Sequence, residues 1–364
     1  IYSGDPAWVN EPLQGASVTD PKQCVERVLL REAVRRRILR DAASVRERLD
    51  TSGIVEAERA GIAADLDAIN AEALTISGDY PADFKAILPV TPLDARVFAA
   101  QARLWRAMKQ PRLTAWAATI WDYLDLTAQP AATDPGSVAV TLMQHEYRAG
   151  AFNLANTGDA SAECAITFEG LPGGATPSYI RVHEVQWTDT SEGTPVAAAL
   201  PDAPLRDGVP TVTVLPGMPR QVWLTFYPTD IPAGDYTGNI LIQSVGETLR
   251  VPVELRLDKR IFPARAALHF GGWDYLNMPA MYEATPENKP ALIATLLEHG
   301  FDSPWATSSA MPRGTHDADG AMTAPPDTAN FDKWVALFPG AAQYLVFAAV
   351  GNNFNGLPMD TPAF

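Results

Sequence analysis

The sequence is poor in cysteine, in basic residues and in long apolar runs, and each shortage excludes a class of protein. Two cysteines, Cys24 and Cys164, occur in 364 residues, too few for a disulfide framework or a cysteine-based zinc site. No run approaches the roughly 18 apolar residues of a membrane-spanning helix. Lys and Arg total 28 against 43 Asp and Glu, and the net charge of −15 would repel nucleic acid. We therefore expect neither nucleic-acid binding nor membrane insertion.

Motifs for metals and cofactors are also missing. The five histidines show no metal-ligand spacing, and Gly271-Gly272 opens no helix of the kind that follows a phosphate-binding loop. Residues 316–320 have the spaced carboxylates of a calcium loop but lack its closing Glu, so we expect a solvated acidic loop there. We therefore expect no cofactor and no metal.

The composition changes near residue 130. Up to that point the chain is rich in Arg and Ala, whereas the remainder is rich in Gly, Pro, Thr and Val and carries most of the excess negative charge. Residues 129–136 consist of turn-forming types and are typical of a linker. We expect a multidomain α plus β protein, with a helical segment at 1–130 and two further domains at 137–262 and 263–364.

Residues 20–130 have the spacing of helices. Apolar residues recur every three or four positions over 30–49 and again over 55–73, which predicts an antiparallel helical hairpin. Thr91-Pro92 has the signature of a helix start, and the apolar spacing at 113–124 predicts one more helix. We interpret the basic run at 35–40 as a solvated helix face. Trp105, Trp116 and Trp121 are interpreted as packing residues.

From residue 137 the apolar spacing changes to alternation, which is typical of half-buried strands. Short stretches of this kind are separated by Gly and Pro turns and predict an antiparallel β-sandwich. Cys164 lies in one of them and is expected to be a buried small hydrophobe. The stretches are 138–142, 149–154, 164–168, 179–187, 211–215, 221–227, 236–243 and 249–257.

Residues 263–364 have the pattern of repeating strand–helix units. Strand-like stretches at 267–275, 301–305 and 344–350 alternate with two helical patterns, which predicts a parallel sheet with right-handed crossovers. These are the first βα units of a TIM-like (β/α)8 barrel. A complete barrel takes about 250 residues, so we expect a truncated one. Either a missing C-terminal region, which we prefer, or a partner chain would cover its open side.

Aromatic and polar residues follow the three predicted barrel strands. The active sites of such barrels lie at the C-terminal ends of the strands. An aromatic ring stacks on the apolar face of a sugar, while Asp and Asn bond its hydroxyl groups. The alternative is that Trp273 and Trp305 pack under loops and that Asn352-Asn353 forms a turn. The candidate substrate-binding residues are Trp273, Asp274, Tyr275, Trp305, Asn352 and Asn353, accompanied by Thr307 and Asn355.

Four segments resemble those of family 123 glycoside hydrolases and related sandwich-plus-barrel proteins: 144–152, 200–205, 220–226 and 231–238. The resemblance extends over about residues 138–360 and implies a sandwich followed by a TIM barrel. Enzymes of that family act on β-linked N-acetylgalactosamine, with a neighbouring Asp-Glu pair on a later strand and the substrate's N-acetyl group as nucleophile. This sequence contains no Asp-Glu dipeptide, so no catalytic residue is assigned.

Two functions therefore stay open. In the first, a glycoside-hydrolase-like protein acts on an extracellular or periplasmic glycan, such as one with N-acetylhexosamine units, and its catalytic acids lie beyond the visible chain. It is then a glycosidase if the full-length chain completes the barrel. In the second, the protein is a non-catalytic surface structural or carbohydrate-binding protein with a degenerate barrel. Both predict a carbohydrate partner and a secreted, periplasmic or cell-surface location.

Overall fold

The computed structural model describes residues 21–77, 80, 84–130, 135–190, 193–264, 267–278, 284–317, 319–348, 353–354 and 357–358. Over these ranges the protein is a mixed α/β structure with several sheets. It divides into two compact units, residues 1–262 and 263–364. None of the helices within these ranges is both long and apolar enough to cross a membrane.

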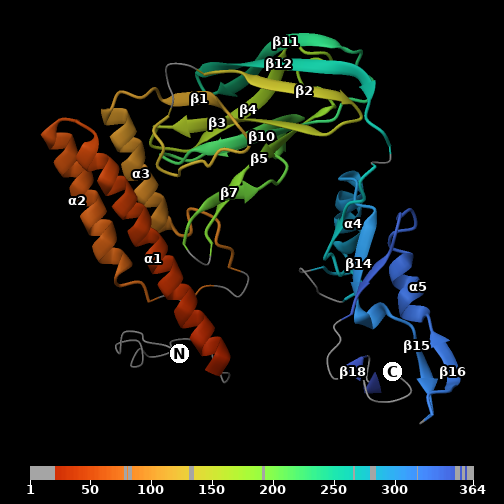
Figure 1. Ribbon diagram of the computed structural model, residues 1–364. Coiled ribbons are helices and arrows are strands. Elements are labelled where there is room, and N and C mark those ends of the chain that lie inside the picture. The colour runs from red at the N-terminus through yellow and green to blue at the C-terminus, as the bar shows by residue number, and fades with distance from the viewer. Residues whose placement is uncertain are drawn as a thin grey trace. The chain divides into compact units, whose positions relative to one another are not determined.

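The first unit begins with three packed helices, α1 (Pro21–Thr51), α2 (Glu56–Ala73) and α3 (Pro92–Ala107) (Figure 1). Both predicted apolar stripes lie in their shared core over 30–49 and 62–73, whereas Val55, the first residue of the second stripe, is 65% exposed. Arg46 bonds the carbonyl of Ala63 and Arg35 bonds that of Ile76, so α1 and α2 run antiparallel, and the predicted hairpin is confirmed. The predicted start of α3 is also confirmed, because the Thr91 side chain accepts the third helical N–H at 3.1 Å.

Arg37 on α1 contradicts the interpretation of residues 35–40 as a solvated helix face. Its side chain is only 4% exposed. The guanidinium donates to the carboxylate of Asp41, to Asp189 Oδ1 at 3.3 Å and to the Gly193 carbonyl at 2.8 Å. Helical spacing alone places Arg37 on the helix surface, but a loop distant in sequence covers that surface.

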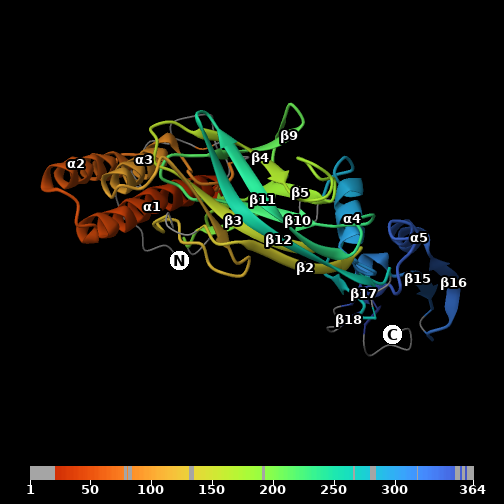
Figure 2. The same cartoon turned by 90° about the horizontal axis from the view of Figure 1, so that it is seen from above.

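Two sheets follow the helices in the first unit. The smaller has the order β1-β3-β10-β5 and the larger the order β2-β12-β11-β4-β9-β8, and β6 and β7 form a separate ribbon. Figure 2 shows β2, β12, β11 and β4 side by side. Strand pairs are antiparallel except for β2 with β12. The bounds are β1 (Leu113–Ala118), β2 (Val138–Gln144), β3 (Arg148–Asn156), β4 (Ala162–Glu169), β5 (Ile180–Glu184), β6 (Gln186–Thr188), β7 (Val196–Ala199), β8 (Leu205–Arg206), β9 (Val209–Val214), β10 (Arg220–Phe226), β11 (Gly234–Ser244) and β12 (Glu247–Ile261).

The inner faces of the two sheets share one hydrophobic core. Alternate residues such as Phe152 on β3 and Val222 on β10 meet Ile240 and Val253 from the larger sheet. The strands predicted between 138 and 257 are confirmed, with 179–187 divided between β5 and β6. Cys164 is fully buried in this core, and burial raises the pKa of its thiol to about 11, as expected for a small hydrophobe.

Residues 113–118 form β1, so the helix predicted over 113–124 is wrong. The strand pairs with β3 from Leu113↔Asn156 to Ala118↔Ala151. In the strand Leu113, Ala115 and Ala117 alternate toward the core, a period of two that the large apolar residues of this stretch, spaced by three and four, did not indicate. Pairing with the edge of β3 gives residues 113–118 the hydrogen bonds of a strand. Tertiary context therefore decides that this segment is a strand and not a helix.

A smaller core joins α3 to β6 and to the turn before β10. It contains Phe98, Trp187 and Met218, and the indole N–H of Trp187 donates to the Pro219 carbonyl at 2.7 Å. Trp105 is buried, as predicted. Trp121, by contrast, is 85% exposed, so its interpretation as a packing residue is wrong: the chain leaves β1 at Ala118 and carries the indole outward.

The second unit contains a parallel sheet of order β13-β14-β17. The predicted strand at 267–275 is shortened to two residues because the chain turns at Asp274, whose N–H bonds the Gly272 carbonyl. The acidic loop at 316–320 belongs to the β15–β16 hairpin. The sequence did not indicate this hairpin, because β16 contains two prolines, which are unusual in strands. The bounds are β13 (Gly271–Gly272), α4 (Lys289–Glu298), β14 (Ser303–Thr307), η3 (Ser308–Ala310), β15 (Arg313–His316), β16 (Met322–Asp327), α5 (Ala329–Val335), β17 (Leu345–Phe347), β18 (Asn353–Phe354) and β19 (Leu357–Pro358).

Candidate functional site

The carboxyl ends of β13, β14 and β17 lie at one edge of the parallel sheet, because parallel strands end on the same side. Several predicted site residues meet there. The rings of Trp273 and Trp305 lie 6.3 Å apart in an edge-to-face arrangement, and Tyr275 lies 6.4 Å from Phe347. Trp273 is 65% exposed, so its ring is available to a ligand rather than packed under a loop.

Asp274 holds this edge together. Its Oδ2 accepts the Trp305 N–H at 2.7 Å and its Oδ1 accepts the Leu276 N–H at 3.1 Å. Burial raises the pKa of Asp274, and the hydrogen bonds from main-chain N–H groups oppose that rise. The carboxylate therefore holds the loop after β13 against β14. Both of its oxygens already accept hydrogen bonds from main-chain N–H groups.

Tyr275 has a strained backbone at the same edge. Its φ is 42°, in the left-handed region that costs a non-glycine residue about 1 kcal/mol or more. The Tyr275 N–H donates to the Trp305 carbonyl at 3.1 Å, and the Tyr275 carbonyl accepts the Met278 N–H at 2.9 Å. These bonds hold the conformation. Residues held in this way are concentrated at functional sites.

A row of hydroxyl and amide groups lies beside the aromatic residues. The Asn277 amide donates to Thr307 Oγ1 at 3.1 Å and to Ser309 Oγ at 2.9 Å. Asn277 Oδ1 accepts the Thr307 N–H at 3.2 Å. Thr307 was predicted here, but Asn277 and Ser309 were not. Their signal is that both are polar and closely follow a predicted strand end, although neither was distinguishable from an ordinary loop residue.

A cavity of about 450 Å³ adjoins this row, within the size range of small-molecule sites. Leu276 and Asn277 contribute to its wall, so the loop that Asp274 fastens is part of the lining. Lys289, the first residue of α4, also lines it and donates to the Leu276 carbonyl at 3.0 Å. Lys333 from α5 contributes a second cation, and the lining residues carry no carboxylate among those the structure describes.

The predicted asparagines cannot be placed in this site. Asn352 and Asn355 lie outside the described residues. Asn353 belongs to β18, which pairs with β19, and its predicted contact with a substrate stays a prediction. Within the described ranges, no group of three His, Cys, Asp or Glu side chains is placed to hold a metal ion. The site is thus built from aromatic rings, hydroxyls, two amides and two lysines.

Comparisons with known proteins give weak structural similarity alone. No protein-family model matches the chain, and no curated protein matches its sequence. A family 123 glycoside hydrolase from Clostridium perfringens is similar with a TM-score of 0.44 at 12% identity, over 62% of this chain. This chain spans 45% of that enzyme's length. The CooA pilin subunit of enterotoxigenic Escherichia coli has a TM-score of 0.20 at 7% identity, over 41% of this chain and 99% of that one.

Proposed function

We propose that this protein binds a glycan at the carboxyl ends of β13, β14 and β17, as part of a glycoside-hydrolase-like protein that acts outside the cytoplasm. The observation that carries the proposal is the exposed ring of Trp273 beside a row of hydroxyl and amide groups. An indole face stacks on the C–H face of a sugar, and such polar groups bond sugar hydroxyls. The adjoining cavity offers space for a neighbouring sugar unit.

The parallel sheet of the second unit supports a barrel as the larger context. In this proposal the first unit's two sheets are a sandwich, and β13, β14 and β17 are the first strands of a (β/α)8 barrel. Leu292 and Leu297 on α4 are partly exposed, as is Phe347 on β17. Further strands and helices of the barrel would cover these apolar groups.

The proposal assigns no catalytic acid to the described residues. Glycoside hydrolysis needs a carboxylic acid and either a second carboxylate or a substrate N-acetyl group. Asp274 is committed to main-chain N–H groups and is assigned a positioning role. The catalytic acids would belong to later strands. Because the Asp274 carboxylate is bonded to main-chain N–H groups, the site fits the second candidate function, a carbohydrate-binding protein without catalysis, equally well.

The substitution Trp273→Ala tests the proposal. We expect isothermal titration with N-acetylhexosamine oligosaccharides to show at least a tenfold loss of affinity, about 1.4 kcal/mol, because the stacking surface is removed. Trp273 is largely exposed, so the variant should unfold at the wild-type temperature.

Leu268→Ala is the matched control. Leu268 is 83% exposed and precedes β13, at the opposite edge of the sheet. Its loss should leave affinity unchanged. Wild-type affinity in Trp273→Ala would remove Trp273 from the site. A separate assay distinguishes the two candidate functions. Turnover of aryl N-acetylhexosaminides by the protein from its natural source would indicate an enzyme, and no turnover would indicate a binding protein.

A further inference from the structure

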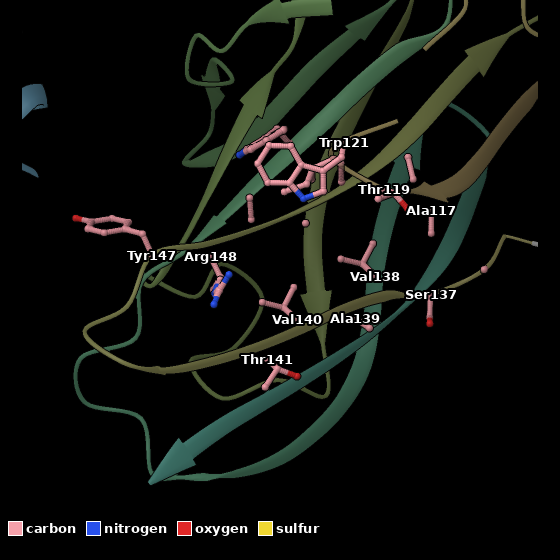
Figure 3. Close-up of a pocket in the computed structure, with 17 residues that line it drawn as sticks. Ala117, Thr119, Trp121, Ser137, Val138, Ala139, Val140, Thr141, Tyr147 and Arg148 are labelled. Carbon is pink, nitrogen blue, oxygen red and sulfur yellow. The ribbon is translucent and has the colours of Figure 1, made fainter. Parts of the chain in front are cut away.

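A second hollow lies in the first unit, beyond the end of β1. Its volume is about 740 Å³, also within the range of ligand sites. We call this hollow the aromatic groove. Its lining, shown in Figure 3, includes Thr119, Trp121, Val138, Val140, Tyr147 and Trp223.

The groove exists because β1 is shorter than β3. Pairing of β1 with β3 stops at Ala118↔Ala151, so residues 148–150 of β3 continue past the end of β1. Strand β2 is at the edge of the larger sheet and forms the facing wall. Gly150 allows the two sheets to meet at the floor, since a Cβ there would lie 2.6 Å from Val138 Cγ1. Any larger residue at this position would push the walls apart.

Three aromatic residues, Trp121, Tyr147 and Trp223, are part of the groove lining. Trp121 is 85% exposed although an indole gains stability from burial. In Figure 3 the side chains of Val138 and Val140 point toward the side on which the Trp121 indole lies. The ring of Tyr147 is stacked on that of Tyr227, with centroids 4.0 Å apart and planes 10° from parallel. This stacking fixes the Tyr147 ring at one end of the groove.

The groove carries almost no net charge although the chain carries −15. Arg148 is the one charged side chain among the described lining residues. Its Nε lies 2.8 Å from Glu146 Oε1, and this pairing neutralises it. The remaining polar side chains of the lining are hydroxyls, from Thr119, Ser137 and Thr141, besides the phenol of Tyr147. Such a surface favours a neutral, hydroxyl-rich ligand over an anion or a cation.

We propose that the aromatic groove binds a neutral oligosaccharide, with one sugar ring stacked on the indole of Trp121. Aromatic faces and hydroxyls in one open groove match the apolar faces and hydroxyls of pyranose rings. An extended peptide is the other ligand that strand edges attract. The uncovered stretch of β3 is only Arg148–Gly150, and the Met143 N–H of β2 is already bonded to Glu146 Oε2 at 2.8 Å. The uncovered stretch of β3 is shorter than an ordinary strand, so that edge offers an extended peptide few hydrogen-bond partners.

The groove and the site at the strand ends are proposed to bind the same class of ligand, but they share no residue. Each proposal can therefore be confirmed or contradicted without the other. The groove is tested by titrating the whole chain with tetramers of N-acetylglucosamine, glucose, xylose and galactose. Binding is measured by isothermal titration calorimetry and by tryptophan fluorescence. We expect at least one tetramer to bind, and Trp121→Ala to weaken that binding at least tenfold with no change in the unfolding temperature.

Tyr123→Ala is the matched control, since Tyr123 is an exposed aromatic residue two positions along the same segment but does not line the groove. Its affinity should equal that of the wild type. Trp273→Ala, measured in parallel, identifies binding that belongs to the strand ends. The proposal is overturned if no tetramer binds, or if Trp121→Ala binds like the wild type.

Two other occupants give distinct results that would also overturn it. If the wild type is a dimer by size-exclusion chromatography with light scattering and Trp121→Ala is a monomer, the groove is an interface between copies. If an alternating Val-Thr peptide competes for the groove with higher affinity than every tetramer, strand addition replaces sugar binding.

Discussion

A buried pair of carboxyl groups lies between α1 and α3. Asp94 is fully buried, its Oδ2 accepts the Val90 N–H at 2.9 Å, and its carboxyl group lies close enough to that of Asp41 for the two to interact electrostatically. Arg37 pairs with Asp41 and also faces Asp189. Burial, reinforced by the charge of Asp41, raises the pKa of Asp94 to about 8. Near neutral pH Asp94 therefore carries a proton.

This proton predicts a pH dependence of stability. The folded chain keeps Asp94 protonated up to about pH 8, whereas the unfolded chain releases the proton near pH 4. The stabilisation is thus complete below about pH 4 and is lost as the pH rises through about 8, with a slope of up to about 1.4 kcal/mol per unit. Asp94→Asn, which does not ionise, should flatten that slope in denaturant titrations between about pH 5 and pH 9. An unchanged slope would contradict the assignment.

Sequence reasoning reaches only part of this arrangement. The helix start at Thr91-Pro92 is a local pattern, and it was predicted correctly. The interaction between Asp94 and Asp41 depends on how α1 packs against α3, and the burial of Arg37 depends on its contacts with Asp189 and Gly193, which are distant in sequence. No local spacing contains that information.

At the scale of elements, the turn between β9 and β10 is fitted to the main chain of α3. Gly217 has a φ of 67°, and a Cβ there would lie 1.8 Å from the Phe98 carbonyl oxygen and 2.6 Å from the Ala102 N. The Gln101 amide donates to the Gly217 carbonyl at 2.7 Å. The helices and the smaller sheet are therefore joined by a main-chain contact that only glycine permits.

We expect Gly217→Ala to lower the free energy of unfolding by about 2 to 3 kcal/mol, since steric overlap adds to backbone strain. Gly208→Ala is the control. Its φ is 79°, but a Cβ there meets no atom of the described residues within 4 Å, so strain alone should cost about 1 kcal/mol. Urea titration of both variants measures the difference. Equal losses would show that the contact with α3 adds nothing.

Element prediction succeeded where burial alternates strongly and failed where tertiary pairing decides. The strands from β2 to β12 combine β-branched residues with clear turns, and most were located from sequence. Strand β1 was taken for a helix because its identity depends on the edge of β3. The β15–β16 hairpin was missed because Pro325 and Pro326 are unusual within a strand.

At the scale of the whole molecule, the hydrophobic cores are divided between the two units. The clusters around Phe152, Ile38 and Trp187 lie within residues 1–262, and those around Phe338 and Trp334 lie within 263–364. We expect a chain ending at Phe262 to keep the thermal transition of the first unit, measured by circular dichroism. A midpoint lowered by more than about 4 °C would show that the first unit needs the second.

The candidate site shows the limit of sequence reasoning at this scale. Trp273, Asp274 and Trp305 were predicted from their places after or within strands, and the structure brings them together. That Asp274 fastens main-chain groups was not predictable, because the bond to Trp305 depends on the register of β13 with β14. The exposure of Trp121 follows from where β1 ends, which helical spacing could not indicate.

The two edges of the parallel sheet differ in the substitutions that they tolerate during evolution. At the amino ends of β13 and β14, Asp302 Oδ1 accepts the Phe270 N–H and the Ser303 hydroxyl, and the Asp302 carbonyl accepts the Ala342 N–H before β17. Strand order is thereby secured away from the candidate site. Substitutions of Trp273 can then accumulate with little loss of fold. Such a division makes specificity evolvable while the scaffold stays robust to mutation.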